Sequence, residues 1–176
     1  MTRFDDIYEI ASDNYGVVTS AEALEVGVTY TELNRHVKNG RLERLGHGVY
    51  KLTRYIPTAN DHFAAAVALV GPGAFIYGES VLSMHKLALV NPRKVYVATS
   101  RRIRKSLPEW ISVITVSEDE IPTNYEGIPS QSVADALLFC TRSVMRDRLI
   151  RAAQDAEREG LIDKATESAL RESLAA

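Results

Sequence analysis

The sequence predicts an α/β (α+β) protein, in which a winged helix-turn-helix of residues 1–56 precedes a small mixed α/β domain with C-terminal helices, residues 60–176. Three observations lead to this prediction. Two helix-start signals lie ten residues apart with a glycine between them. Two apolar runs then flank the short segment Gly46-His47-Gly48. After residue 60, helical and strand-like segments alternate, which is typical of mixed folds.

The two helices have well-marked ends. Thr19 and Glu22, and again Thr29 and Glu32, have the spacing of a capping box, in which a hydroxyl and a carboxylate bond the free N–H groups of the first helical turn. Gly27 lies between the boxes, where a sharp turn needs unusual backbone angles. Gly40 is placed to end the second helix.

The second helix divides into an apolar and a polar face. Tyr30, Leu33 and Val37 share one stripe and are expected to pack on the first helix. The opposite stripe carries hydroxyl, amide and cationic groups that reach base edges and phosphates. We expect Arg35 and Asn34 to contact bases, and Thr31 and Lys38 mainly phosphates. The alternative for the stripe alone is a solvated polar face.

The hairpin favours the nucleic-acid interpretation. Basic residues alternate with apolar ones around a small tip, which can approach a sugar-phosphate backbone closely. His47 is the bulky residue of the tip, and its alternative role is that of a turn residue without contacts. Our full set of candidate DNA-binding residues is Thr29, Thr31, Asn34, Arg35, Lys38, Arg41, Arg44, His47 and Lys51.

Charge is unevenly distributed along the chain. The whole protein has a formal net charge of −2, which does not by itself indicate a nucleic-acid binder. Residues 28–56, however, carry six Lys or Arg against two acids, whereas residues 1–27 carry one Arg against six acids. The predicted winged helix is therefore polarised, with its basic part on the expected DNA side.

The segment NGRLERLGHGVYKL resembles the winged helix of AbiEi-family antitoxins from type IV toxin–antitoxin systems, which have a Gly-x-Gly tip between an Arg-rich and a Val-Tyr strand. The segments GPGAFIYGESVLSMHKLA, VYVATSRRIRK and GIPSQSVADALLFC resemble parts of the second domain of that family. The resemblance implies a repressor of its own operon that counteracts a nucleotidyltransferase-like toxin. It also implies that repression uses the winged helix and that neutralisation depends on the second domain.

The second domain is expected to begin with a helix over residues 61–70, after a linker near residues 54–60. Gly71-Pro72-Gly73 would end that helix. A short strand at 74–77, a helix through Leu87 and strands at 95–99 and 111–116 would follow. Three helices near residues 131–141, 143–159 and 163–174 would complete the chain.

A second basic cluster lies in residues 91–108, which contain no acid. Such a cluster can neutralise phosphates, so it could extend a DNA footprint or hold RNA. It could also meet an acidic toxin surface, and the remaining alternative is a solubilising loop that binds nothing. Its members are Arg93, Lys94, Arg101, Arg102, Arg104 and Lys105.

Catalysis, metals and cofactors are not expected. The sequence has no phosphate-binding loop, nucleophile elbow, zinc-protease or CxxC motif. A nucleophile pair of Ser80 or Ser83 with His85 is conceivable, although a packed or surface helix histidine is the favoured interpretation. The single cysteine, Cys140, lies in an apolar run and is expected to be a buried thiol. No signal peptide or bilayer-spanning run is visible, so we expect a cytoplasmic protein.

Two function classes remain open at this point. The first is a DNA-binding autorepressor and antitoxin, which would bind double-stranded DNA at its own promoter, at inverted repeats, as a monomer or weak homodimer, and would meet a cognate toxin. The second is a protein- or RNA-binding module in which the winged helix is only a scaffold, because fold alone does not settle function.

Overall fold

The computed structural model describes residues 3–176, and the chain divides into two compact units. The first unit comprises residues 1–74 and 102–108, and the second comprises residues 75–101 and 109–176. This division differs from the predicted domains, because the helix over residues 61–70 is part of the first unit. The predicted boundary near residues 54–60 instead coincides with the irregular segment that precedes this helix.

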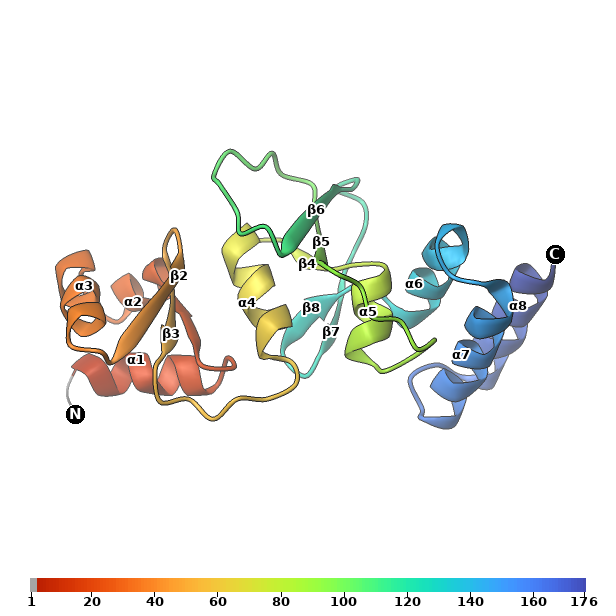
Figure 1. Cartoon of the computed structure of the whole chain (residues 1–176), viewed down its shortest axis with the longest axis horizontal. Helices are drawn as coiled ribbons and strands as arrows, with labels where there is room; N and C mark the ends of the chain where they lie inside the picture. Colours follow the sequence, from red (N-terminus) through yellow and green to blue (C-terminus); the bar gives the residue numbers. More distant parts are fainter. Residues whose placement is uncertain (1–2) are drawn as a thin grey trace. The chain divides into compact units, whose positions relative to one another are not determined.

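The first unit has the predicted order of helix, turn, helix and hairpin (Figure 1). Two elements that the sequence analysis did not predict precede it, a helix and a short strand. The elements are α1 (Arg3–Ser12), β1 (Val17–Thr19), α2 (Ser20–Glu25), α3 (Tyr30–Lys38), β2 (Leu42–Gly46), β3 (Val49–Leu52) and α4 (Asp61–Val70).

The hairpin is part of a three-stranded antiparallel sheet in the order β1-β3-β2. Val18 pairs with Tyr50, and Leu42 pairs with Leu52. The second hairpin strand, β3, ends at Leu52, before the predicted end of the winged helix at residue 56. Because β3 lies between β1 and β2, the edges of this sheet are the outer sides of β1 and β2.

One apolar core holds these elements together. Ile7 and Ala11 from α1, Leu33 from α3, and Val18 and Tyr50 from the sheet are all buried in it. The acidic N-terminal segment is therefore an amphipathic helix, with its apolar stripe in the core and with Asp5 and Glu9 exposed. Burial of this stripe joins the helix-turn-helix and the hairpin into a single body.

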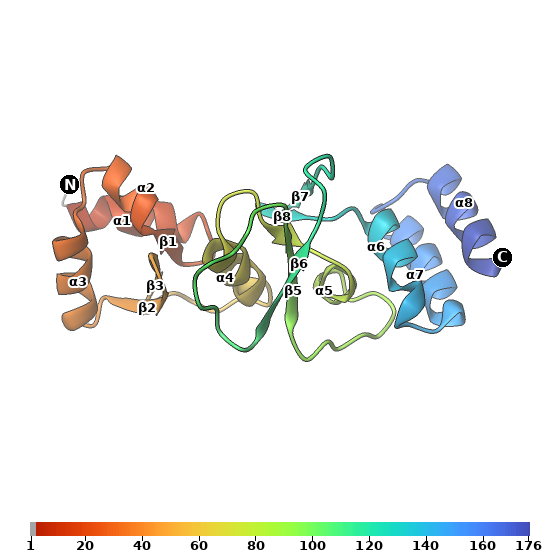
Figure 2. The ribbon, with the colours of Figure 1, turned by 90° about the horizontal axis from the view of Figure 1, so that it is seen from above.

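The second unit contains a mixed five-stranded sheet in the order β6-β5-β4-β8-β7 (Figure 2). β4 (Phe75–Ile76) pairs antiparallel with β5 (Val95–Thr99) and parallel with β8 (Ile128–Ser130). β6 (Ile111–Thr115) runs parallel to β5, and β7 (Thr123–Tyr125) runs antiparallel to β8. The strands β4, β5 and β6 were predicted, whereas the hairpin of β7 and β8 was not.

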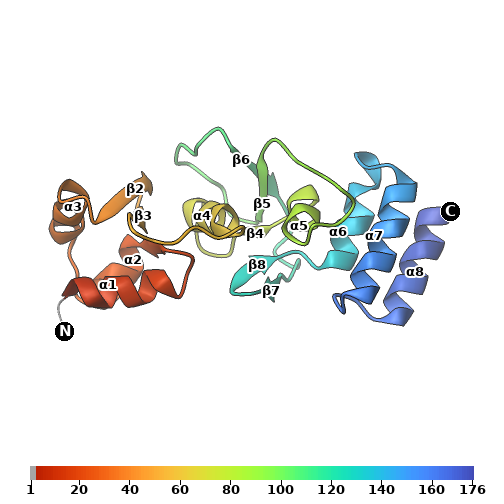
Figure 3. The same ribbon diagram turned by 60° about the horizontal axis from the view of Figure 1, so that its bottom comes forward.

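Helices complete the second unit. α5 (Glu79–Met84) follows β4, and α6 (Val133–Phe139) continues into the 3-10 turn η1 (Cys140–Arg142). α7 (Arg146–Arg158) and α8 (Lys164–Ala175) pack beside α6 as three neighbouring helices (Figure 3). Cys140 is buried, as predicted, and desolvation followed by the nearby charge of Glu79 raises the pKa of its thiol to about 12. The α/β class of the chain is confirmed.

Candidate nucleic-acid interface

Both predicted capping boxes are formed, and they fix where α2 and α3 begin. In the first, the Thr19 hydroxyl accepts from the Glu22 N–H at 3.2 Å, and the Glu22 carboxylate accepts from the Thr19 N–H at 2.7 Å. In the second, Thr29 and Glu32 make the equivalent bonds at 3.3 and 2.9 Å. A cap of this kind stabilises a helix by about 0.5–2 kcal/mol, so the start of α3 is firmly placed.

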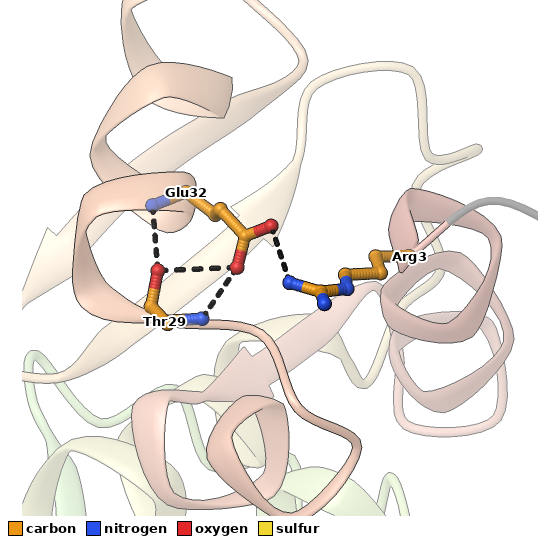
Figure 4. Close-up of polar contacts among 3 residues, drawn as sticks. All are labelled: Arg3, Thr29 and Glu32. Carbon is orange, nitrogen blue, oxygen red and sulfur yellow. Dashed lines mark hydrogen bonds and ion pairs between the residues drawn. The ribbon is translucent and has the colours of Figure 1, made fainter.

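Glu32 also links α3 to α1. Arg3 Nη1 lies 3.0 Å from Glu32 Oε1, while Glu32 Oε2 accepts from the Thr29 hydroxyl and N–H (Figure 4). The hydrogen bond from the Thr29 backbone, followed by those from its hydroxyl and Arg3, lowers the pKa of the Glu32 carboxyl. The sequence analysis missed the Arg3–Glu32 pair, because its members are 29 positions apart and no local spacing indicates it.

The inner face of α3 differs from the predicted one. Leu33 and Val37 do pack inward, but Tyr30 is 57% exposed and the third inward residue is His36, 7% exposed. The reason is that Phe4 of α1 packs against the His36 ring, with centroids 4.8 Å apart, so α1 rather than α2 completes this face. Burial, then the charges of Arg41 and Arg35, lower the pKa of His36.

The outer face of α3 presents the predicted polar stripe to solvent. Thr31, Asn34, Arg35 and Lys38 are all exposed. They lie on one side of a helix whose other side is buried, so the backbone that carries them is held by the core. The stripe therefore combines hydrogen-bonding and cationic groups on a fixed support, which is what a helix needs to read a DNA groove.

The hairpin tip is tightly packed rather than loose. A Cβ atom at Gly46 would lie 2.5 Å from Leu69 Cδ2 of α4, and one at Gly48 would lie 2.9 Å from Ser20 Oγ of α2. Gly48 also has a positive φ of 68°, and its carbonyl accepts from the Ser20 N–H at 2.8 Å. The two glycines of the predicted tip thus permit close packing against α2 and α4.

The basic residues of the hairpin are less uniform than those of α3. Arg44 is exposed, and its Nε donates to the Gly46 carbonyl at 3.2 Å, beside a bulge in β2. Lys51 is half-buried, with its Nζ 3.6 Å from Asp61 Oδ2 at the start of α4. His47 is exposed, and Arg41 is exposed with its guanidinium 4.9 Å from the centre of the Phe4 ring.

Thr29 has a structural role in addition to any external contact. Its hydroxyl accepts from the Glu32 N–H and lies within hydrogen-bonding distance of the Glu32 carboxylate. Of the nine candidate DNA-binding residues, Thr29, Arg44 and Lys51 therefore have polar partners within the chain.

The second basic cluster is divided between the two units. Arg102, Arg104 and Lys105 are part of the first unit, where Lys105 Nζ approaches Gly71 at the end of α4. Arg93, Lys94 and Arg101 are part of the second unit, on either side of β5. These six residues are therefore close in sequence but do not belong to one compact unit.

The alternative catalytic pair is not supported by its contacts. The Ser80 hydroxyl accepts from the Tyr96 N–H at 2.8 Å, and the His85 ring packs on Tyr125 with centroids 4.2 Å apart. Burial lowers the pKa of His85. Over residues 3–176, no group of three or more His, Cys, Asp or Glu residues is arranged to hold a metal ion.

Residues 5–53 match the model of the family described as "Transcriptional regulator, AbiEi antitoxin". The AbiEi match runs from α1 to the end of the hairpin, and so confirms the resemblance for this segment. The comparison with curated proteins returned no match.

The matched segment lies within the first unit, and the family that it resembles is one of antitoxin transcriptional regulators. Among the helices of residues 3–176, none has the length and apolar character needed to cross a bilayer.

Proposed function

We propose that the protein is a winged-helix repressor that binds DNA at its own promoter and acts as the antitoxin of a nucleotidyltransferase-like toxin. The observation that carries the proposal is the outer face of α3, where Thr31, Asn34, Arg35 and Lys38 are exposed on a capped and core-supported helix. The AbiEi match over residues 5–53 supports the regulatory and antitoxin parts.

Within this proposal the α3 residues have different tasks. Arg35 and Asn34 contact base edges, since a guanidinium bonds guanine bidentately and a carboxamide bonds adenine in the same way. Thr31 and Lys38 contact phosphates and set the register of the helix in the groove. Arg41, Arg44 and His47 add contacts from the hairpin, while Thr29 and Lys51 contribute mainly by fixing the positions of α3 and the sheet.

The expected DNA is an inverted repeat. A single winged helix reads few base pairs, so two copies on two half-sites gain affinity, and the protein acts as a monomer or weak homodimer that pairs on DNA. Its place of action is the cytoplasm, where the promoter lies. The cationic residues 93, 94, 101, 102, 104 and 105 provide further contacts to nucleic acid or to an acidic surface of the toxin.

Fluorescence anisotropy tests the DNA-binding part. The DNA immediately upstream of the gene is compared with a scrambled duplex of equal length across a salt series. We expect a preference for the native duplex that persists as salt is raised. Equal, salt-sensitive binding to both duplexes, or binding to neither, would contradict the repressor and favour the scaffold alternative.

Substitution of Arg35 with Ala locates the contact. The loss of a bidentate base contact should weaken binding by about 1–3 kcal/mol and relax the preference at one base pair. Arg146→Ala is the matched control, because Arg146 is an exposed arginine at the start of α7 in the second unit. If the Arg35→Ala protein binds the native duplex with the affinity of the wild type, α3 is not part of the DNA interface.

A further inference from the structure

A pocket of about 380 Å³ lies in the first unit on elements that the DNA-binding proposal uses little. Its walls come from α1, from the turn that joins α3 to β2, and from the end of β3. This volume falls within the range of roughly 300–1,000 Å³ typical of small-molecule sites. The pocket is therefore large enough for a ligand of nucleotide size.

The charged groups of this pocket are cationic. Arg41 and Arg54 both line it and both are exposed. Among the residues that the structure describes, no carboxylate lines the same space. Two guanidinium groups without a carboxylate between them favour an anion, and their planar donor pattern suits phosphate or carboxylate oxygens.

The same pocket offers flat surfaces beside its charges. Phe4 lines it and already stacks under the Arg41 guanidinium, 4.9 Å from the ring centre. Tyr8, one helical turn further along α1, also lines it and is 53% exposed. Guanidinium planes and tyrosine rings are the surfaces on which bases stack in nucleotide sites. The exposed Asn39 adds a carboxamide, which can both donate and accept a hydrogen bond.

We propose that this pocket binds a small anion that carries a planar aromatic ring, of the nucleoside monophosphate class. The phosphate pairs with Arg41 and Arg54, and the base stacks on Tyr8 or on the open side of Arg41. The proposal goes beyond DNA recognition, because Tyr8, Asn39 and Arg54 are outside the candidate DNA-binding set. Bound ligand would join α1, the α3–β2 turn and β3, which are separate segments of the chain.

Binding can be followed on the full chain by NMR, without DNA. Gly40 lines the pocket and its backbone N–H provides the reporter, while Gly127 between β7 and β8 is the reference in the second unit. Adenosine monophosphate, adenosine and inorganic phosphate are titrated separately. We expect saturable shifts at Gly40 with the monophosphate, weaker binding by about tenfold or more for either fragment, and no change at Gly127.

Two substitutions locate the ligand. Arg54→Gln removes one cation, and loss of a charge-assisted hydrogen bond should weaken monophosphate binding about tenfold. Tyr8→Ser removes a half-exposed ring and should weaken binding of the monophosphate but not of inorganic phosphate. Arg146→Gln is the matched control, since Arg146 is an exposed arginine of the second unit that does not line the pocket. Unchanged shifts elsewhere in the spectrum verify that each variant is folded.

Three outcomes would overturn the proposal. They are no saturable shift with the monophosphate, equal affinity for inorganic phosphate and the monophosphate, and equal binding by Arg54→Gln and the wild type. A final titration uses the upstream DNA duplex: if it shifts Gly40 while the monophosphate does not, the pocket holds a DNA phosphate instead. Because the ligand titrations contain no DNA, failure of the repressor proposal would leave their result unaffected.

Discussion

Helix α3 and the β2–β3 hairpin both carry basic residues on the surface of the first unit, yet they differ in how those residues are used. The four outer residues of α3 are exposed on a helix that is fixed by its caps and by its buried face. In the hairpin, Arg44 bonds its own strand, Lys51 pairs with Asp61, and both tip glycines pack against neighbouring helices. The two elements are therefore similar in their content of basic residues but differ in how many of those residues have partners within the protein.

Under the proposed function, α3 recognises DNA, whereas the hairpin mainly supports the fold of the first unit. The α3 stripe can change its contacts without disturbing the core, because its side chains point to solvent. Changes in the hairpin affect the packing of α2 and α4 as well as any contact with DNA. Substitutions in α3 should therefore alter affinity, whereas substitutions in the hairpin should alter stability.

The largest expected effect on stability is that of Gly46→Ala. Its new methyl group would lie 2.5 Å from Leu69 Cδ2, and Leu69 is buried, so the side chain has little room to move. Overpacking of this kind costs about 1–3 kcal/mol in the free energy of unfolding, which urea denaturation measures.

Leu69→Ala provides the control for Gly46→Ala. If the two side chains clash, the double variant should lose less stability than the sum of the two single variants. Additive losses, or a Gly46→Ala protein as stable as the wild type, would show that the hairpin tip does not pack against α4. The hairpin would then not differ from α3 in its structural role.

A matched pair of threonines tests the contrast within α3 itself. Thr29→Ala removes the helix cap and should lower the free energy of unfolding by about 0.5–2 kcal/mol. Thr31→Ala removes an exposed hydroxyl of the outer stripe and should leave stability within about 0.5 kcal/mol of the wild type.

Thr31→Ala should affect DNA binding more than it affects stability. Anisotropy with the upstream duplex should record weaker binding for Thr31→Ala, provided the titration is made well below the unfolding temperature of both variants. A Thr31→Ala protein that loses stability but keeps its affinity would place Thr31 in the supporting role instead.

The smallest effect concerns pH and His36. Burial, then Arg41 and Arg35, hold the pKa of His36 below its ordinary value of 6.5. Below that pH the unfolded chain takes up a proton that the folded protein excludes. Neutral His36 therefore makes its full contribution to the free energy of unfolding above pH 6.5. This contribution is lost as the pH falls toward the pKa of His36 in the folded protein.

His36→Phe should reduce the loss of stability on acidification between about pH 7 and 5, measured by urea denaturation at several pH values. It should not abolish it, because burial also lowers the pKa of His62 and His85. Direct NMR titration of the His36 ring provides the second measurement. A pKa close to 6.5 there would mean that the ring is solvated and that α1 does not cover α3.

Local signals in the sequence were sufficient for α2, α3 and the hairpin. Each capping box needs only residues three positions apart, and the tip glycines lie between strands that are neighbours in sequence. The exposed α3 stripe followed from helical periodicity for the same reason. Tyr30 was placed wrongly, because the partner of that face is Phe4 of α1, which no spacing within α3 reveals.

Features that depend on distant partners were missed. β1 has three residues and exists through its pairing with β3, over thirty positions away. The polar strand β7 is formed through its hairpin with β8. The sequence also assigned α4 to the second domain, since nothing local shows that Leu69 meets Gly46 or that Asp61 pairs with Lys51. Those contacts become visible only when the chain is folded.

The return of residues 102–108 to the first unit has a consequence for synthesis and for proteolysis. The chain leaves this unit after Ala74, builds β4, α5 and β5 of the second, and then contributes the Arg102–Pro108 loop to the first before going back. A ribosome must therefore have synthesised the chain as far as Pro108 before the first unit has all these parts. A protease that cuts between Ala74 and Arg102 would separate one continuous stretch of this unit from the segment that completes it.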